Sequence, residues 1–350
     1  MNTQVKRYVK VFISLLVGVL ILWLITRGQD VPRIMEEFRH ANYGWILLAM
    51  LCALLSHFLR AVRWNMLIRT MGYKTNNYQT FLAVMTGYLS NLAIPRMGEI
   101  TRCVTLSKAS KTPFNALAGT VLAERAFDLF SMLAIVFITI AGQFSFLRNF
   151  LLQTIWAPTL ERGTAHWLLI SIVTILFLAL IIILILFLRK NLYNPREGSF
   201  FFRLKRQMHG FSSGVSTIKD MRGKGWFVLH TLLIWGLYYL TVYLCFFAIQ
   251  ATSDLTALAG LTLLAVGSLG ILAPVPGGIG TYHFLTIITL RELYGIASEP
   301  ATSYAYITHA TQIVVNITAG TFAWIMLSLK KQNHDTQQTS APDGKDHQDA

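Results

Sequence analysis

The feature that most constrains this chain is a series of apolar stretches, several of them long enough to cross a membrane. They cover residues 9–26, 44–59, 114–141, 166–188, 225–250 and 302–328. Only 13% of the 350 residues are charged, which is about half the share typical of soluble domains. The sequence therefore predicts an all-α polytopic membrane protein in which these six stretches are transmembrane helices.

The number and positions of the basic residues indicate the membrane topology of the chain and the kind of partner it can bind. Lys and Arg outnumber Asp and Glu by 30 to 16, which gives a formal net charge of +14. These cations gather in short loops and near helix ends, as topology signals and contacts with anionic headgroups require. The chain has no zinc knuckle, RNA-binding aromatic motif or basic recognition helix, so we expect no nucleic-acid partner. The three scattered cysteines predict neither a disulfide framework nor a metal site.

Loop charge suggests that two apolar segments do not cross the membrane. The basic N-terminus and the basic loop 189–224 should both be cytoplasmic. Residues 60–77 and 96–113 are basic as well, yet the apolar segment 78–94 separates them. We therefore expect 78–94 to enter and leave on the cytoplasmic side as part of a re-entrant hairpin. Span 225–250 leaves the cytoplasm and span 302–328 returns to it, so the segment between them must start and end outside. We therefore expect 256–290 to form a second re-entrant hairpin from the outer side, with both termini cytoplasmic.

The six spans and two hairpins form two halves of inverted orientation. A shared G-x-L-x-x-L-A motif, Gly87–Ala93 and Gly267–Ala273, supports this repeat. Hairpins interrupted by Gly and Pro in corresponding halves are typical of transporter binding sites. The predicted organisation is one integral membrane domain 1–329, with halves of about 1–150 and 165–329, and a disordered cytoplasmic tail 330–350.

The first candidate site is the run after the first hairpin arm. Pro95 should end that arm, and Gly98 should allow a tight turn. If a helix starts here, Glu99 and Arg102 share one face, and its free backbone N–H groups attract anions. Arg96 and Arg102 could then frame a phosphate or headgroup. The alternative is an ordinary cytoplasmic loop whose cations only set topology.

The second candidate site is an ionisable cluster about ten residues into an apolar helix. Glu124 and Asp128 are four residues apart and share a face, with Arg125 between them. Such groups are costly in a membrane unless they are paired or hydrated, so they normally face an internal cavity. Arg96 or Arg102 could neutralise them across the interior. The alternative is a purely structural ion pair that fixes helix packing.

The third candidate site is the turn of the second hairpin. Its residues are Pro276, Gly277, Gly278 and Gly280. The prolines should interrupt a helix, and the glycines would let the backbone approach a ligand. The alternative is that the glycines serve only close helix packing. Two further residues are weaker candidates. Arg63 could simply snorkel at the end of the second span. His309, in the last span, is more typical of a structural histidine than of a proton carrier.

Three motifs resemble one known family. The runs P-R-x-G-E-x-x-R, E-R-x-x-D and P-G-G-I-G occur in the order found in the lysylphosphatidylglycerol synthase transmembrane region, also called the flippase-like domain family. The resemblance covers residues from about 10 to 328. It implies translocation of a lipid between leaflets, or the membrane part of a lipid-modifying enzyme. Since only about twenty polar residues follow the last span in this sequence, we expect no soluble aminoacyltransferase domain beside these motifs and do not predict synthase activity.

We therefore expect a lipid translocase that moves a polar- or phosphate-headgroup lipid, with anionic or phosphate-bearing membrane lipids as its partners. The alternatives are a membrane-embedded enzyme acting on lipids or polyprenyl carriers, with Glu124 and Asp128 as its acid–base or metal-binding pair, and a scaffold subunit for a separate partner enzyme. We predict no catalytic residue, metal or cofactor for the translocase. A homo-oligomer is compatible with the sequence. The expected location is the bacterial cytoplasmic (inner) membrane.

Overall fold

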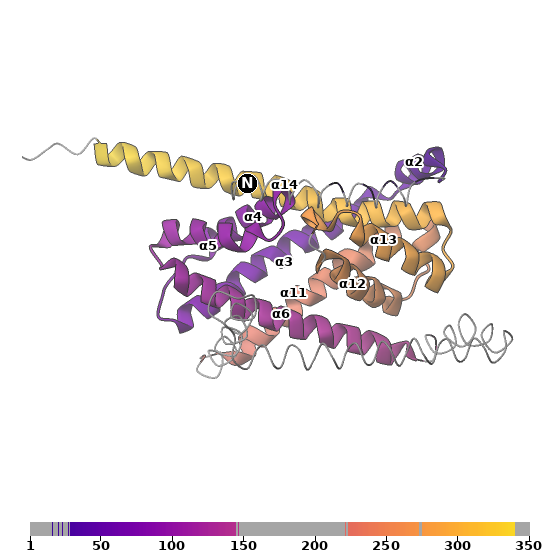
Figure 1. Ribbon diagram of the computed structural model, residues 1–350, viewed down its shortest axis with the longest axis horizontal. Helices are drawn as coiled ribbons and strands as arrows, with labels where there is room; N and C mark the ends of the chain where they lie inside the picture. The colour runs from indigo at the N-terminus through magenta and orange to yellow at the C-terminus, as the bar shows by residue number, and fades with distance from the viewer. Residues whose placement is uncertain are drawn as a thin grey trace, which may run out of the picture.

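The computed structural model describes residues 29–144, 223–272 and 275–339, together with a few single positions outside these ranges. Two of the predicted spans, 9–26 and 166–188, lie outside the described residues. Within those residues the fold is helical and has no strand (Figure 1). The helices are α2 (Val31–His40), α3 (Tyr43–Thr70), α4 (Asn77–Ala93), α5 (Met97–Ser110), α6 (Phe114–Gly142), α11 (Lys224–Leu244), α12 (Ala257–Leu272), α13 (Thr281–Ile288) and α14 (Ser298–Thr339), with short turns η2 (Cys245–Ala248), η3 (Gln250–Thr252), η4 (Pro276–Gly278) and η5 (Thr289–Leu293).

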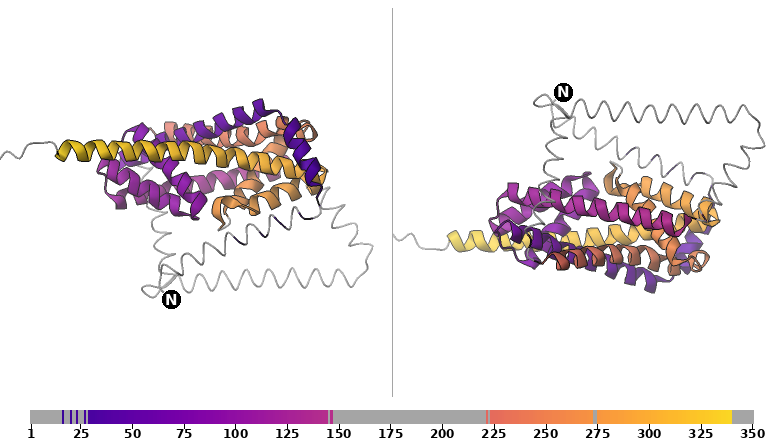
Figure 2. Two further views of the ribbon diagram at one scale, coloured as in Figure 1. Left: turned by 90° about the horizontal axis from the view of Figure 1, so that it is seen from above. Right: turned by 90° about the horizontal axis from the view of Figure 1, so that it is seen from below.

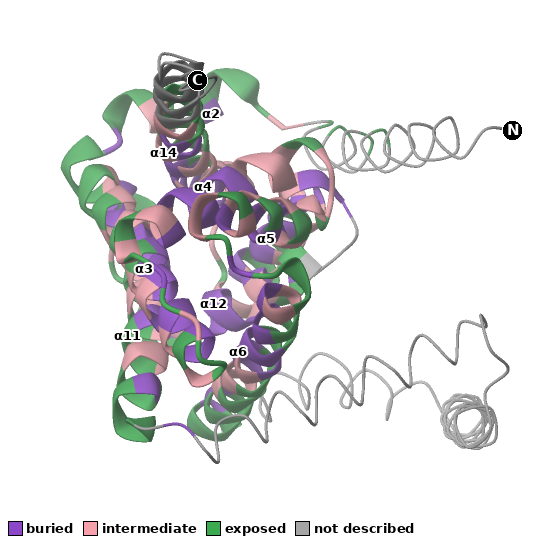
Figure 3. Ribbon diagram, turned by 90° about the vertical axis from the view of Figure 1, so that its left-hand side faces the viewer, coloured by how far each residue is buried: buried purple, intermediate pink, exposed green. Residues whose placement is uncertain are grey.

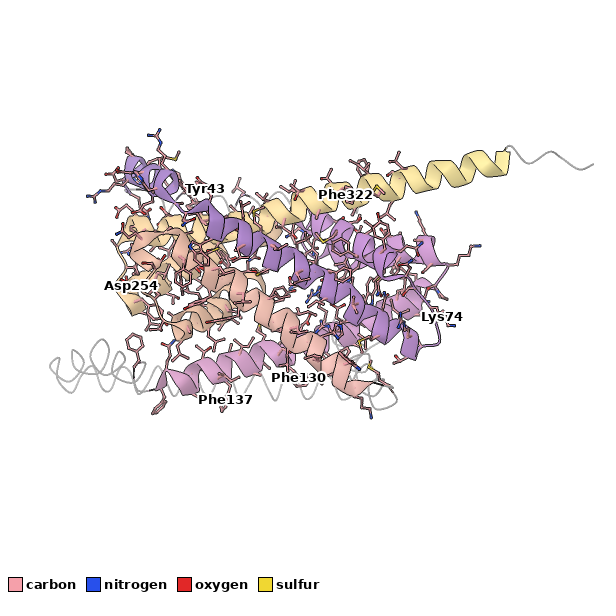
Figure 4. All side chains as sticks on the ribbon, turned by 180° about the vertical axis from the view of Figure 1, so that it is seen from behind. Tyr43, Lys74, Phe130, Phe137, Asp254 and Phe322 are labelled. Atoms are coloured by element: carbon pink, nitrogen blue, oxygen red, sulfur yellow. The ribbon has the colours of Figure 1, made fainter. Side chains whose placement is uncertain are left out.

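Three helical segments in the described part of the chain are long and apolar enough to cross a membrane. They are Tyr43–Thr70, Lys224–Ala248 and Ser298–Leu329, and they match three of the predicted spans. Helix α6 has 29 residues and coincides with the predicted span 114–141, although it carries the ionisable cluster. Large apolar side chains cover the outside of the bundle; Phe137, for example, is 72% exposed (Figure 4). An apolar exterior of this kind is expected for a protein that lies in lipid.

Helix α3 is longer than the sequence predicts. The predicted span ends at residue 59, which places Arg60 and Arg63 among the cations of a loop. The helix instead continues to Thr70, and the two arginines are only 4% and 0% exposed. The reason is that the residues after Arg60 remain apolar at helical spacing, with Trp64 and Ile68 buried in the same core. The loop to α4 keeps Lys74 as its exposed cation.

Helix pairs α4–α5 and α12–α13 lie at opposite ends of the bundle (Figure 1). Helix α4 has 17 residues and α12 has 16, so each rises about 25 Å. That length is shorter than the hydrocarbon core of about 30 Å. Each pair therefore has the dimensions of a hairpin that enters the membrane without crossing it.

The arms of each hairpin pack closely at the glycine that opens the shared motif. A Cβ atom on Gly87 would lie 2.8 Å from the carbonyl oxygen of Gly98 and 3.2 Å from Cβ of Arg102. In the second hairpin, a Cβ atom on Gly267 would lie 2.7 Å from Cε2 of Tyr282. A larger residue at Gly87 or Gly267 would require the facing atoms, the Gly98 carbonyl oxygen or the Tyr282 ring, to move. The first glycine of the motif therefore lies at a close helix contact in both hairpins.

The bundle has two main groups of buried apolar residues, and the second also includes Ala49 of α3. Buried residues of α3, α4, α5 and α6 pack around Trp64. Buried residues of α11, α12, α14 and the turns beside them pack around Tyr304. The end-on view in Figure 3 shows the buried surfaces of the helices facing inward and the exposed surfaces facing outward.

Helix α14 runs along most of the bundle and continues beyond it (Figure 2). It extends to Thr339, ten residues into the segment that the sequence predicts to be a disordered tail. No Pro or Gly occurs between Leu329 and Pro342, so nothing in this stretch interrupts the helical backbone.

Candidate functional site

A buried ionic cluster joins α3, α5 and α6. The two oxygens of Asp128 lie 2.6 Å from Nη2 of Arg60 and 2.6 Å from Nη2 of Arg63. Nη1 of Arg102 lies 2.9 Å from Oε2 of Glu124, and the other oxygen of Glu124 lies 3.4–3.5 Å from the two α3 arginines. One carboxylate pair thus holds three guanidinium groups from two other helices.

Helical spacing explains why these side chains converge. Arg60 and Arg63 are three residues apart and lie on one face of α3, while Glu124 and Asp128 are four apart and lie on one face of α6. The facing helices α3 and α6 are held together by the apolar core around Trp64 and by a hydrogen bond of 2.9 Å from Trp64 Nε1 to Thr120 Oγ1.

A second ion pair lies at the edge of this cluster. Nη2 of Arg125 is 3.2 Å from Oε1 of Glu99, and these side chains are 42% and 31% exposed. Both residues line a small cleft between α4, α5 and α6, and Arg102 forms part of its wall; the remaining lining residues are Val84, Gly87, Tyr88, Asn91 and Gly98. The cleft therefore connects one buried arginine, Arg102, with the outside of the bundle.

The cluster and its edge carry more positive than negative charge. Four arginines face three carboxylates, which leaves a formal excess of one positive charge. Arg102 is only 3% exposed, yet within the part of the chain that the structure describes its Nε and Nη2 atoms have no hydrogen-bond partner, and neither does Oε2 of Glu99. The guanidinium of Arg102 lies over the Trp64 ring at 4.7 Å from its centroid. Unpartnered donors of a buried cation beside a cleft are suited to hold an anion.

The structure brings together five residues that the sequence analysis assigned to separate runs: Glu99, Arg102, Glu124, Arg125 and Asp128. The expected pairing of Arg102 with an acid of the second run occurs with Glu124. Arg96 does not join them; it is exposed and forms no ion pair among the described residues. It takes the left-handed conformation (φ 63°) just before α5.

The predicted turn role of Gly98 was wrong. Gly98 lies inside α5, and its role is close packing, because a Cβ atom there would clash with the carbonyl oxygen of Gly87 and with the Asn91 side chain. Its backbone N–H donates to Oδ1 of Asn91 at 2.6 Å, which fastens the start of α5 to the end of α4.

The interpretation of Arg63 as a snorkelling residue was also wrong, because its side chain is fully buried and bound to two carboxylates. Arg60 was not proposed for the site at all. It also donates from Nη1 to the hydroxyl of Tyr88 at 2.8 Å. The signal that could have revealed both residues is the apolar periodicity that continues beyond Arg60 to Ile68.

The glycine-rich turn lies apart from the ionic cluster. Gly277, Gly278 and Gly280 adopt positive φ angles, which glycine accommodates without strain, and Pro276 begins η4. Nε2 of His309 is 2.8 Å from the carbonyl oxygen of Gly277. The turn and His309 thus form a second polar cluster.

Both buried carboxylates of the ionic cluster, Glu124 and Asp128, form ion pairs with arginines. This pairing disfavours a role for them as proton acceptors or metal ligands. Within the part of the chain that the structure describes, no three His, Cys, Asp or Glu residues are grouped so that they could hold a metal ion.

Comparison with known proteins identifies relatives of the whole domain. The sequence model described as "Lysylphosphatidylglycerol synthase TM region" matches residues 11–320. A UPF0104 membrane protein of Methanocaldococcus jannaschii is 23% identical, with 91% of this chain and 95% of the relative covered. A UPF0104 membrane protein of Methanothermobacter thermautotrophicus is 24% identical, with 79% and 83% covered.

A further relative is named Glycosyltransferase AglD, from Haloferax volcanii. It is 22% identical over 93% of this chain, but this chain spans only 56% of that protein. No solved structure matches the chain. The relatives and the apolar helices together identify a multi-pass membrane protein.

Proposed function

Because this chain belongs to the lysylphosphatidylglycerol synthase transmembrane-region family, we propose that it is a lipid translocase whose ionic cluster receives a phosphate-bearing headgroup. One observation carries the proposal: Arg102 is buried beside a cleft, and two of its guanidinium nitrogens have no hydrogen-bond partner among the described residues. A phosphodiester carries one negative charge, which equals the formal excess of positive charge in the cluster. Its oxygens accept the bidentate hydrogen bonds that guanidinium groups donate.

In this proposal the two edge residues exchange partners. Arg125 leaves Glu99 and binds the entering phosphate, and Arg102 donates its unpartnered Nη2 to a second phosphate oxygen. Asp128 and Glu124 remain bound to Arg60 and Arg63 and keep these cations in place. The acyl chains stay in lipid, outside the apolar surface of the bundle.

The proposed membrane arrangement follows the sequence prediction. Six spans and two re-entrant hairpins form inverted halves, both termini are cytoplasmic, and the halves rock about the hairpins. The opposite placement of α4–α5 and α12–α13 supports this arrangement (Figure 1). So does the close glycine contact at equivalent motif positions, Gly87 and Gly267. We propose the bacterial cytoplasmic membrane as the location.

The second candidate is the membrane part of a lipid- or polyprenyl-modifying system, either as an enzyme or as a scaffold for a separate enzyme. It is favoured by the relative named Glycosyltransferase AglD, which is almost twice as long as the region matched here. Lipid analysis of a strain lacking the protein separates the candidates. A lost or altered lipid species supports the enzyme or scaffold, whereas a changed leaflet distribution of unchanged species supports the translocase.

The direct test uses proteoliposomes that contain phosphatidylglycerol with a fluorescent label on its acyl chain. Wild-type protein should move this lipid between leaflets faster than protein-free vesicles, and Arg125→Gln should reduce the rate at least tenfold. Arg33→Gln is the matched control, because Arg33 is exposed on α2 and outside the cluster. If wild type and protein-free vesicles move the lipid equally fast, the proposal fails.

A further inference from the structure

Two histidines meet in the half of the bundle that does not contain the buried arginine cluster. His283 of α13 and His309 of α14 are 3% and 4% exposed. Their ring centroids are 4.6 Å apart, and the rings are nearly perpendicular at 84°. The sequence analysis did not single out His283, and the headgroup site does not use either residue.

Both histidines hold the glycine-rich turn. The carbonyl oxygen of Gly277 can only accept, so Nε2 of His309, 2.8 Å away, carries the hydrogen in this pair. The backbone N–H of Gly280 donates to Nδ1 of His283 at 3.4 Å, so that nitrogen carries none. His283 is therefore neutral in this geometry, and Nδ1 of His309 is the nitrogen whose protonation would leave both of these hydrogen bonds intact.

The groups that face the pair are uncharged at neutral pH. Tyr282 of α13 stacks on His309 with centroids 5.0 Å apart, and Tyr306 of α14 lies 4.7 Å from His283. Beyond them lie Tyr304 of α14 and Cys245 of η2, which both interact with Tyr282. Helix α12, which packs on Tyr282 through Gly267 and Gly270, contains no ionisable residue.

Among the residues that the structure describes, no Lys or Arg is buried in this half of the bundle, and Arg291 of η5 is exposed. An anionic headgroup that leaves the arginine cluster would therefore enter a region without a resident cation. Histidine is the side chain that most readily gains a positive charge near neutral pH. Two imidazoles in contact cannot both be charged, so the pair has a capacity of one proton.

A chain of contacts joins the histidine pair to the headgroup site. Gly277 is bonded to His309 and packs against Leu92 at the end of α4, where an added Cβ would lie 3.4 Å from Cδ2 of that leucine. The neighbouring residue, Asn91, accepts a hydrogen bond of 2.6 Å from the backbone N–H of Gly98 at the start of α5. These contacts connect the turn to the helix that carries Arg102.

We propose that His283 and His309 form a proton-binding site that couples the passage of an anionic headgroup to the movement of one proton. This inference rests on the proposed lipid translocase. The proton comes from water on the side where the lipid starts, binds an imidazole nitrogen of the pair, and balances the phosphate charge beyond the arginine cluster. It returns to water when the headgroup reaches the opposite leaflet.

The test measures transfer of acyl-labelled phosphatidylglycerol with a pH gradient across the proteoliposome membrane. Its phosphodiester does not titrate between pH 5 and pH 8, and potassium with valinomycin holds the voltage at zero. The quantity compared is the lipid-transfer rate with the pH gradient divided by the rate without it. When the side from which the lipid starts is the acidic one, this ratio should exceed one and approach about tenfold per pH unit. The His283→Gln/His309→Gln protein should give a ratio of one. The glutamine amide introduced in place of His309 can still donate to the Gly277 carbonyl.

Two controls keep the assignment specific. His40→Gln, on the exposed face of α2, should keep the wild-type ratio. His57, which lies beside the arginine cluster with its ring 4.2 Å from that of Tyr88, is the competing proton site. If His57→Gln abolishes the response while the double variant keeps it, the inference is wrong.

Wild-type protein alone also decides the question, whether or not the double variant folds. Adding phosphatidylglycerol to the outer leaflet should acidify the vesicle interior, as reported by a trapped pH indicator. Lipid transfer with a ratio of one and no proton flux would overturn the coupling and leave the translocase intact. Absence of lipid transfer would overturn the translocase, and the coupling with it.

Discussion

Arg63 and Asp128, which are 65 residues apart in the sequence, meet at 2.6 Å between Nη2 and Oδ1. The arginine side chain is fully buried and that of the aspartate is 11% exposed. Because the second oxygen of Asp128 binds Arg60, a single carboxylate fastens two successive turns of α3 to α6. The site that we propose for the headgroup is therefore also a structural junction of the first half of the bundle.

Asp128→Asn should destabilise the protein strongly. Breaking a buried ion pair from one side leaves an uncompensated charge and costs about 3–5 kcal/mol, and here two arginines lose a partner. Thermal unfolding of the detergent-solubilised protein should show a lower midpoint than wild type. Glu292→Gln, at an exposed helix end, is the control and should unfold as wild type does. Equal midpoints for Asp128→Asn and wild type would show that the junction contributes nothing to stability.

Glu99→Gln should strengthen binding of an anionic lipid. Glu99 occupies Arg125 at 3.2 Å in the absence of a ligand, so it competes with the incoming phosphate. A partly exposed pair contributes about 0.2–1 kcal/mol, which predicts an affinity gain of about 1.4- to fivefold. Calorimetric titration with short-chain phosphatidylglycerol measures this gain, and Glu36→Gln on the exposed face of α2 is the control. Weaker binding by Glu99→Gln would mean that Glu99 helps to hold the ligand.

Gly98→Ala should disrupt the first hairpin. The added Cβ atom would clash with the Gly87 backbone and with Asn91, neither of which can move without separating α4 from α5. Gly119→Ala is a matched control in α6, where nothing lies within 4 Å of the added atom, and where alanine favours the helix by about 1 kcal/mol. We expect a lower unfolding midpoint for Gly98→Ala and an unchanged or higher one for Gly119→Ala. Equal behaviour of the two variants would contradict the close packing.

The sequence predicted those parts of the site that depend on local spacing. Glu124 and Asp128 share a helical face by their spacing alone, and their depth in an apolar helix required an internal cation. Which cations pair with Glu124 and Asp128 depends on how α3 packs against α6, and no local sequence pattern contains that information. Arg60 therefore resembled the end of a helix. His283 and His309 are likewise brought together by tertiary packing, since 26 positions separate them.

The sequence also did not predict which residue adopts the left-handed backbone conformation before α5. Gly98 has the residue type of a tight turn, but the left-handed conformation falls on Arg96. The physical reason is the hydrogen bond from Gly98 to Asn91, which draws Gly98 into α5 and leaves the turn to the residues before it.

Sidedness of the first hairpin gives the most decisive topological prediction. Lys74 precedes α4 and Lys111 follows α5, and both are exposed. Tyr43 and Asp254 lie at one end of the bundle and Lys74 at the other (Figure 4). After replacement of Cys52, Cys103 and Cys245, single cysteines at 74 and 111 should react with a membrane-impermeant maleimide from the cytoplasmic side only. A cysteine at 254 should react from the opposite side only. If positions 74 and 111 react from different sides, α4 and α5 do not form a re-entrant hairpin, and the headgroup site needs another route to lipid.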